Sequence, residues 1–160
     1  MKYNRFEELP VWNAAIGLAV DVYKITSDPA FSGRGNLRDQ LERAAVSISN
    51  NIAEGFERGT KHELLNFLYI ARGSAGEVRS MLCLLDRLPG FSNLKFQISN
   101  LKLNAEEISR QLRGWADFLQ ESPIKGQKYL TEKARTASRA KADREEFLKE
   151  LRRIQTGTGD

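Results

Sequence analysis

The sequence predicts an all-α protein: an up-down-up-down four-helix bundle followed by a basic C-terminal helix or tail. Apolar residues recur at helical spacing in four long segments. Short breaks rich in glycine, proline and asparagine separate these segments. Helices joined by short connections pack antiparallel to one another, and no segment indicates a convincing strand. We therefore assign residues 1–122 to the bundle and residues 123–160 to the tail.

The first helix is expected to begin at Leu9 or Pro10, because proline suits a first turn, where its missing N–H has no partner in any case. The run at residues 26–29, which ends in Pro29, stops it. One face carries apolar residues at helical spacing, and we expect it to point inward: Trp12, Ala15, Ile16, Ala19, Val20 and Tyr23.

The second helix is expected to start at Asn36 as its N-cap and to end at Gly59, since glycine tolerates the left-handed conformation of a C-terminal cap. Its predicted inward residues are Leu37, Leu41, Ala44, Ala45, Ile48, Ile52 and Phe56.

Thr60 and Glu63 form a capping box, in which each side chain accepts from the other residue's backbone N–H, and this predicts the start of the third helix. That helix runs to about Leu88, before the break at Pro89 and Gly90. Its predicted inward residues are Leu64, Phe67, Leu68, Ala71, Ala75, Val78, Leu82 and Leu85.

The fourth helix is expected to begin near Ser92 or Asn93. Its apolar residues alternate in steps of three and four, as in left-handed helix bundles. They are Leu94, Ile98, Leu101, Ala105, Ile108, Leu112, Trp115 and Leu119.

The net charge of +4 lies in the tail. Residues 1–124 hold 15 Lys and Arg against 15 Asp and Glu, whereas residues 125–160 hold 10 against 6. Residues 128–155 have the composition of a basic, weakly amphipathic helix. A nucleic-acid contact inferred from charge therefore falls on the tail, and its candidate residues are Lys133, Arg135, Arg139, Lys141, Arg144, Arg152 and Arg153.

Cys83 is the single cysteine, so the chain has no intrachain disulfide and suits a reducing compartment. The first twelve residues have no apolar run of the kind a signal peptide needs, and no stretch approaches the roughly 20 apolar residues that span a bilayer. We therefore expect a soluble, cytoplasmic protein without a membrane role.

The sequence offers no catalytic or metal-binding constellation. The single histidine, His62, lacks the second histidine that a zinc-protease motif needs at position 66, where Asn66 stands. Cys83 is flanked by leucines and suggests a structural thiol. We therefore expect no cofactor, no metal and no enzymatic activity.

Small and polar residues accompany the apolar stripes of the second and third helices. Such residues suggest close helix approach and buried hydrogen bonds, within the bundle or between subunits. For the carboxylates Glu54 and Glu77 we favour this structural role over a catalytic pair. The structural or interface set is Ser47, Asn51, Glu54, Gly55, Gly73, Ser74 and Glu77, with Gly76 also allowing close backbone approach. We interpret Trp12 and Trp115 as core residues.

With these residues placed, the chain resembles the bacterial four-helix-bundle family encoded within intervening sequences of large-subunit ribosomal RNA genes. The same family includes the accessory variability proteins of diversity-generating retroelements. The resemblance covers about Phe6 to Leu119 and rests on Phe6, Leu9, Val11, Trp12, Ala44, Ala45, Ser47, Ile48, Asn51, Ile52, Ala53, Glu54, Gly55, Arg58, Thr60, Glu63, Phe67, Leu68, Ala71, Gly73, Ser74 and Glu77.

The resemblance implies a four-helix protomer, a homopentameric barrel as in several members, and no known enzymatic activity. In the retroelement branch it also implies binding to nucleic acid, RNA or DNA, and to a reverse transcriptase. That branch is strongly basic on its body, whereas the body of this chain is neutral. Either the basic tail replaces that charge or this member has another role. The body positions to inspect for nucleic-acid contacts are Arg38, Arg43, Arg58, Arg72 and Arg79.

The sequence is compatible with three functions. The first is a non-enzymatic homo-oligomer that binds RNA or DNA through the tail. The second is an oligomeric scaffold that binds a protein through the apolar tail residues Phe147, Leu148, Leu151 and Ile154. The third, a hydrolase using Glu54 or Glu77, has the least support.

Overall fold

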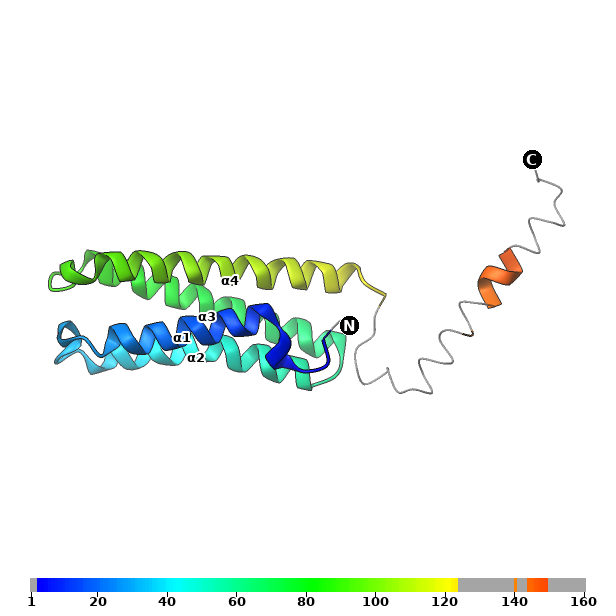
Figure 1. Cartoon of the computed structure of the whole chain (residues 1–160), viewed down its shortest axis with the longest axis horizontal. Helices are drawn as coiled ribbons and strands as arrows, with labels where there is room; N and C mark the ends of the chain where they lie inside the picture. Colours follow the sequence, from blue (N-terminus) through cyan, green and yellow to red (C-terminus); the bar gives the residue numbers. More distant parts are fainter. Residues whose placement is uncertain (1–2, 124–139, 141–143, 150–160) are drawn as a thin grey trace, which may run out of the picture.

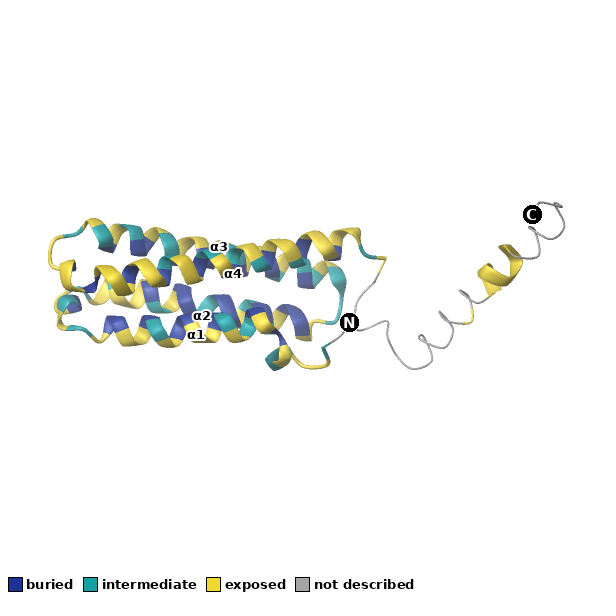
Figure 2. Cartoon of the chain, turned by 45° about the horizontal axis from the view of Figure 1, so that its top comes forward, coloured by how far each residue is buried: buried dark blue, intermediate teal, exposed yellow. Residues whose placement is uncertain are grey.

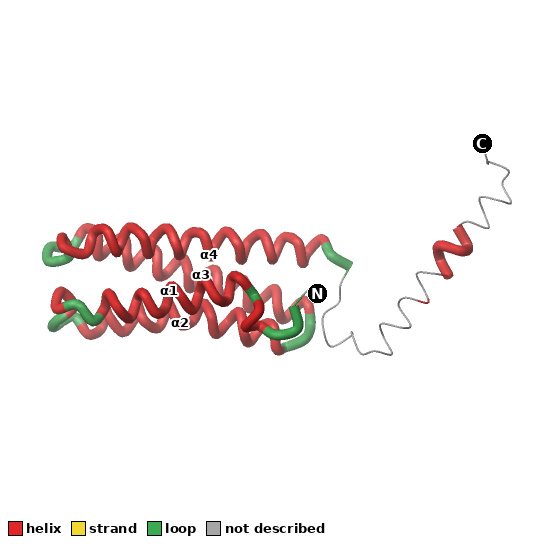
Figure 3. Tube along the Cα trace, viewed as in Figure 1, coloured by secondary structure: helices red, strands yellow, loops and turns green. Residues whose placement is uncertain are grey.

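The computed structural model describes residues 3–123, residue 140 and residues 144–149. Four long antiparallel helices form a bundle, and the described residues contain no strand (Figures 1 and 3). The long helices are α1 (Pro10–Thr26), α2 (Gly35–Glu57), α3 (Lys61–Arg87) and α4 (Lys95–Glu121). Short 3₁₀ turns lie at η1 (Phe6–Glu8), η2 (Pro29–Phe31) and η3 (Ser92–Leu94). The all-α prediction is confirmed.

Long helices that are consecutive in the sequence pack on each other, and α4 closes the bundle by packing on α1. Buried residues therefore lie on the sides of the helices that face one another, and exposed residues lie on the outside of the bundle (Figure 2). The largest fully buried side chains come from all four helices and from the α3–α4 connection: Leu18, Val22, Leu41, Ile48, Ile52, Leu68, Leu82, Leu85, Phe91, Ile98, Ile108 and Leu112.

Most predicted helix ends are confirmed. α1 begins at Pro10, Gly59 has the left-handed φ of 77° after α2, and the Thr60 hydroxyl accepts from the backbone N–H of Glu63. The second half of the capping box differs, because the Glu63 carboxylate accepts from the Thr60 hydroxyl at 2.5 Å. The prediction that Asn36 caps α2 is wrong. Asn36 lies inside the first turn, and its side-chain oxygen accepts from Leu37 N at 2.8 Å.

The predicted inward face of α1 is wrong in part. Ala15 and Ala19 are buried, and Val11, Leu18, Val22 and Ile25 complete the inward face. The predicted Ile16, Val20 and Tyr23 are instead 37%, 48% and 49% exposed. The physical reason is that residues 10–20 contain no charged side chain, so this part of α1 has no charged face to fix the orientation of its apolar stripe.

Neither tryptophan is a fully buried core residue. Trp12 and Trp115 are half-buried and pack against the edge of the core. Trp12 meets the Phe6 ring edge-to-face, with centroids 5.2 Å apart. In α4 the inward position next to Trp115 belongs to Ala116, which is 1% exposed.

The α1–α2 connection and the α3–α4 connection lie at the same end of the bundle and contact each other. Phe31 and Phe91 pack edge-to-face at 5.0 Å, and the Arg34 guanidinium lies 4.8 Å from the Phe91 ring centroid. Arg34 also donates to the Pro89 carbonyl at 3.3 Å. These contacts fix the end at which α1 leads into α2 and α3 into α4.

Candidate functional site

A polar seam joins α2 to α3. The Ser47 and Ser74 hydroxyls lie 2.9 Å apart, and the Asn51 amide donates to the Ser47 carbonyl at 2.7 Å and to its hydroxyl at 3.0 Å. Ser74 is buried and also lies 3.1 Å from the Ile70 carbonyl, a second possible acceptor. The Ser47–Ser74 hydrogen bond joins the two helices within one protomer, as the small and polar residues predicted, while the bonds of Asn51 to Ser47 and of Ser74 to Ile70 each lie within one helix.

Glu54 and Glu77 lie outside this seam and are not buried within the protomer, and the other predicted alternative, a contact between subunits, stays a prediction. Both are exposed. The Glu54 carboxylate accepts from Arg58 at 2.6 Å, and that hydrogen bond raises the pKa of Arg58 above its ordinary value. Glu77 has no hydrogen-bond or ion-pair partner among the described residues. Long side chains on the edge of the helix reach water, whereas the short Asn51 side chain folds back on its own helix.

Gly55 is the glycine at which α2 and α3 approach closely. A Cβ at Gly55 would lie 2.6 Å from the Phe67 Cβ and 3.3 Å from Leu64 Cδ1. Gly73 and Gly76 do not have the predicted role within the protomer, because both are exposed and a Cβ at either would meet nothing within 4 Å. The sequence could not separate these glycines, since the difference lies in the facing helix.

The five body arginines do not form one basic patch. Arg38 and Arg58 lie 20 residues apart on α2, which is about 30 Å along a helix. Arg38 pairs with Asp39 at 3.3 Å and Arg79 with Glu106 at 3.4 Å, while Arg43 donates to a carbonyl of its own helix. Arg72 alone has no partner among the described residues. This pairing leaves little free positive charge on the bundle.

The predicted tail residues lie largely outside the described residues. Lys133, Arg135, Arg139, Lys141, Arg152 and Arg153 are all outside them. Arg144 is described, and it lies exposed in the helical residues 144–149 together with Phe147 and Leu148, which are 63% and 42% exposed.

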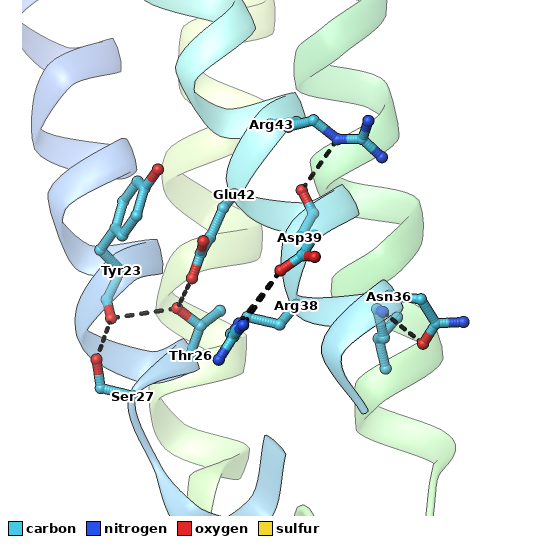
Figure 4. Close-up of polar contacts among 9 residues, drawn as sticks. Tyr23, Thr26, Ser27, Asn36, Arg38, Asp39, Glu42 and Arg43 are labelled. Carbon is cyan, nitrogen blue, oxygen red and sulfur yellow. Dashed lines mark hydrogen bonds and ion pairs between the residues drawn. The ribbon is translucent and has the colours of Figure 1, made fainter. Parts of the chain in front are cut away.

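Two open grooves border α1. One, of about 500 Å³, lies between α1 and the first turns of α2 and is lined by Tyr23, Asn36, Asp39, Gln40, Glu42 and Arg43. There the buried Thr26 hydroxyl donates to Glu42 at 2.5 Å (Figure 4). The other, of about 320 Å³, lies between α1 and α4 and is lined by Asp21, Lys24, Ile25, Asp28, Leu94, Gln97, Asn100, Leu101 and Asn104. The hydroxyl that meets a carboxylate at the first groove, that of Thr26, is itself buried.

His62 and Cys83 lie 21 residues apart on α3, so they do not form a thiol–imidazole pair. His62 is exposed in the first turn of α3, with its ring nitrogen 3.5 Å from the Asn66 amide, and Cys83 is half-buried. Within the described residues, no three His, Cys, Asp or Glu side chains gather to hold a metal ion. The described part of the chain also contains no helix long and apolar enough to cross a membrane.

An apolar surface on α1 is the feature that the sequence reasoning placed in the core. We call it the α1 stripe, and it consists of Trp12, Ile16, Val20 and Tyr23 at spacings of four, four and three residues. Between Pro10 and Val20 the helix has no charged side chain, and only Asn13 carries an amide or hydroxyl group. A helix that is apolar on all sides is typically buried on all sides, and that signal was present in the sequence.

Comparisons with known proteins agree on the fold and the family. A family model described as 23S rRNA-intervening sequence protein matches residues 7–114. A solved structure from Bacteroides thetaiotaomicron, a protein of unknown function from the S23 ribosomal protein family, has the same fold with a TM-score of 0.59 and 22% identity. The match covers 66% of this chain and 97% of that one. No curated protein matches the chain.

Proposed function

Because the chain belongs to the family of 23S rRNA-intervening sequence proteins, we propose that it is a non-enzymatic homo-oligomer that binds RNA or DNA. The observation that carries the proposal is the α1 stripe. A protomer alone leaves four large apolar side chains of α1 at least partly in contact with water. A second copy of the chain that covers them removes this cost.

The gain from covering the stripe is appreciable. Burying a large apolar side chain completely is worth about 1.5–3 kcal/mol, and Val20 and Tyr23 are about half exposed. Covering the stripe therefore contributes on the order of 1 kcal/mol for each side chain. The resemblance implies five copies, and we adopt a pentamer as the stoichiometry of the proposal. The single cysteine is compatible with a cytoplasmic location.

The nucleic-acid part of the proposal rests on charge. The bundle is neutral and most of its arginines are paired, whereas residues 125–160 carry 10 Lys and Arg against 6 Asp and Glu. Contacts between these side chains and phosphates release counterions, so affinity should fall linearly with the logarithm of salt concentration. An oligomer presents the tail several times, which turns weak single contacts into avidity.

A fluorescence anisotropy titration tests this assignment. Full-length protein and a variant ending at Pro123 are titrated against single- and double-stranded RNA and DNA at two salt concentrations. This truncation keeps Ser122, whose carbonyl accepts from Lys61 at 2.9 Å. The proposal expects salt-dependent binding by the full chain and a large loss on truncation. Equal binding by both proteins would move the contact to the bundle, and no binding by either would reject the nucleic-acid role.

A second candidate is an oligomeric scaffold for a protein, and the exposure of Phe147 and Leu148 favours it. In one branch the resemblance implies a reverse transcriptase as that partner. A variant with both residues changed to alanine should then lose the protein partner while its salt-dependent nucleic-acid binding is unchanged. The reverse result would assign the tail to nucleic acid alone.

A further inference from the structure

A second surface on the bundle complements the α1 stripe, and it lies along the seam between α2 and α3. Ser74 turns toward α2, where its hydroxyl meets Ser47. On a helix, residues three or four apart share a side, so Ile70 and Glu77 flank the same edge as Ser74, and Leu84 lies seven residues beyond Glu77. We call Asn51, Ile70, Gly73, Glu77, Ser80 and Leu84 the α2–α3 face.

The shape of the α2–α3 face can accommodate the apolar side chains of the α1 stripe. Ile70 and Leu84 are 51% and 46% exposed, and between them lie Gly73 and Ser80, which are also exposed. A Cβ added at Gly73 would meet nothing within 4 Å, so the surface is low at that point. Ile70 and Leu84 are 14 residues apart and Trp12 and Tyr23 are 11 apart, which corresponds to about 21 Å and 17 Å along a helix. The two surfaces are therefore of comparable length.

The hydrogen-bonding groups of the two surfaces are also complementary. The indole N–H of Trp12 and the hydroxyl of Tyr23 are donors with no partner among the described residues. Glu77 is an acceptor without a partner in the same part of the chain, and the side-chain hydrogen bonds of Asn51 use only its amide nitrogen. Buried Trp and Tyr side chains usually find a partner for their polar atom. The serine hydroxyls of the seam bond to each other, so a neighbour can cover them at little cost.

We propose that the α1 stripe of one copy packs on the α2–α3 face of the next copy, in a head-to-tail interface. This inference rests on the proposed homo-oligomer and adds the identity of the two surfaces. A two-fold pairing of α1 with α1 would leave Ile70, Leu84 and Glu77 uncovered.

The position of the two surfaces also favours a ring. The α1 stripe borders α2 at Tyr23, which lines the groove between these helices, and the second surface includes the other flank of α2. The two surfaces therefore lie on adjacent sides of the bundle, so each copy turns relative to the one before it. Head-to-tail contacts with such a turn form a ring when the rotation closes after a whole number of copies, as the adopted pentamer requires.

Cysteine cross-linking tests the pairing. In a Cys83→Ala background, Val20→Cys labels the α1 stripe and Ser80→Cys labels the α2–α3 face, and the two proteins carry different tags. Subunits are mixed, exchanged by mild denaturation and refolding, and treated with a short bismaleimide. Ser99→Cys on α4 is the matched control, because it is exposed outside both surfaces.

The expected result is a mixed Val20→Cys and Ser80→Cys dimer as the main product, and a ladder of products when one chain carries both changes. A dominant dimer of two Val20→Cys chains would overturn the inference in favour of a two-fold interface. An oligomer that cross-links no better through Ser80→Cys than through Ser99→Cys would overturn it while leaving the proposed assembly intact. A monomeric mass for the Cys83→Ala protein and the parent chain alike would reject the assembly itself.

Discussion

Replacing Gly55 by alanine should destabilise the bundle, although alanine is the better helix former. The new Cβ would lie 2.6 Å from the Phe67 Cβ, where ordinary contact begins at 3.4 Å, so α2 and α3 must separate locally by about 0.8 Å. Neither Cβ can rotate away, because both are fixed to the backbone. Overpacking of this kind costs about 1–3 kcal/mol, and part of it is offset by the gain of about 1 kcal/mol in helix propensity.

We therefore expect Gly55→Ala to lower the free energy of unfolding by up to about 2 kcal/mol, and in any case not to raise it. Gly114→Ala is the matched control, because Gly114 is also helical and a Cβ there would meet nothing within 4 Å. The control should raise the free energy of unfolding by about 0.5–1 kcal/mol.

The measurement is urea unfolding followed by far-ultraviolet circular dichroism, at one fixed protein concentration because association shifts apparent stability. A shift of 1 kcal/mol corresponds to roughly 2–4 °C in Tm for a chain of this size, so a thermal scan provides a second reading. If Gly55→Ala raised the free energy of unfolding as much as Gly114→Ala does, the close approach of α2 and α3 at Gly55 would be refuted.

The remaining predictions concern polar side chains. Asn51→Ala should lower the free energy of unfolding by about 0.5–1.5 kcal/mol, because the hydrogen bonds of Asn51 to Ser47 are lost. Glu54→Ala should leave Tm unchanged. An equal loss of stability in the two variants would contradict the seam described above. The hydrogen bond from Lys102 lowers the pKa of Asp86 below its ordinary value, so this pair stabilises the fold above the ordinary carboxyl pKa and the effect is lost as pH falls through the lowered value. Lys102→Met should return the Asp86 pKa toward its ordinary range in a carboxyl NMR titration, and an unchanged value would argue against the ion pair.

The sequence predicted the bundle well where local signals were strong. Pro10, Thr60 and Gly59 mark helix ends through backbone geometry that needs no tertiary context. The inward faces of α2, α3 and α4 were largely identified because charged residues occupy their outer faces and fix the orientation of the apolar stripe. The predicted Leu37 and Phe67 lie at the edges of that stripe, where they are half-buried.

The errors have a common origin in information that only the neighbouring helix supplies. α1 offers two apolar faces between Pro10 and Val20, and the choice between them depends on the packing of α2 and α4. Gly55 and Gly73 are equivalent in sequence terms, but only Gly55 faces a large side chain, Phe67. Asn51 and Glu54 share a flank of α2, and the length of the side chain decides which one bonds within the seam.

The central claim, that the α1 stripe is covered by another copy of the chain, is tested most directly by the mass in solution of Val20→Glu. Phe96→Glu is the matched control, since Phe96 is 76% exposed on α4 and belongs to neither proposed surface. Multi-angle light scattering at micromolar concentration should show one oligomeric mass for the parent chain and for Phe96→Glu. It should show a monomer of unchanged helicity for Val20→Glu, because a buried, unpaired carboxylate opposes association. A monomeric parent chain, or a Val20→Glu variant of undiminished mass, would contradict the account.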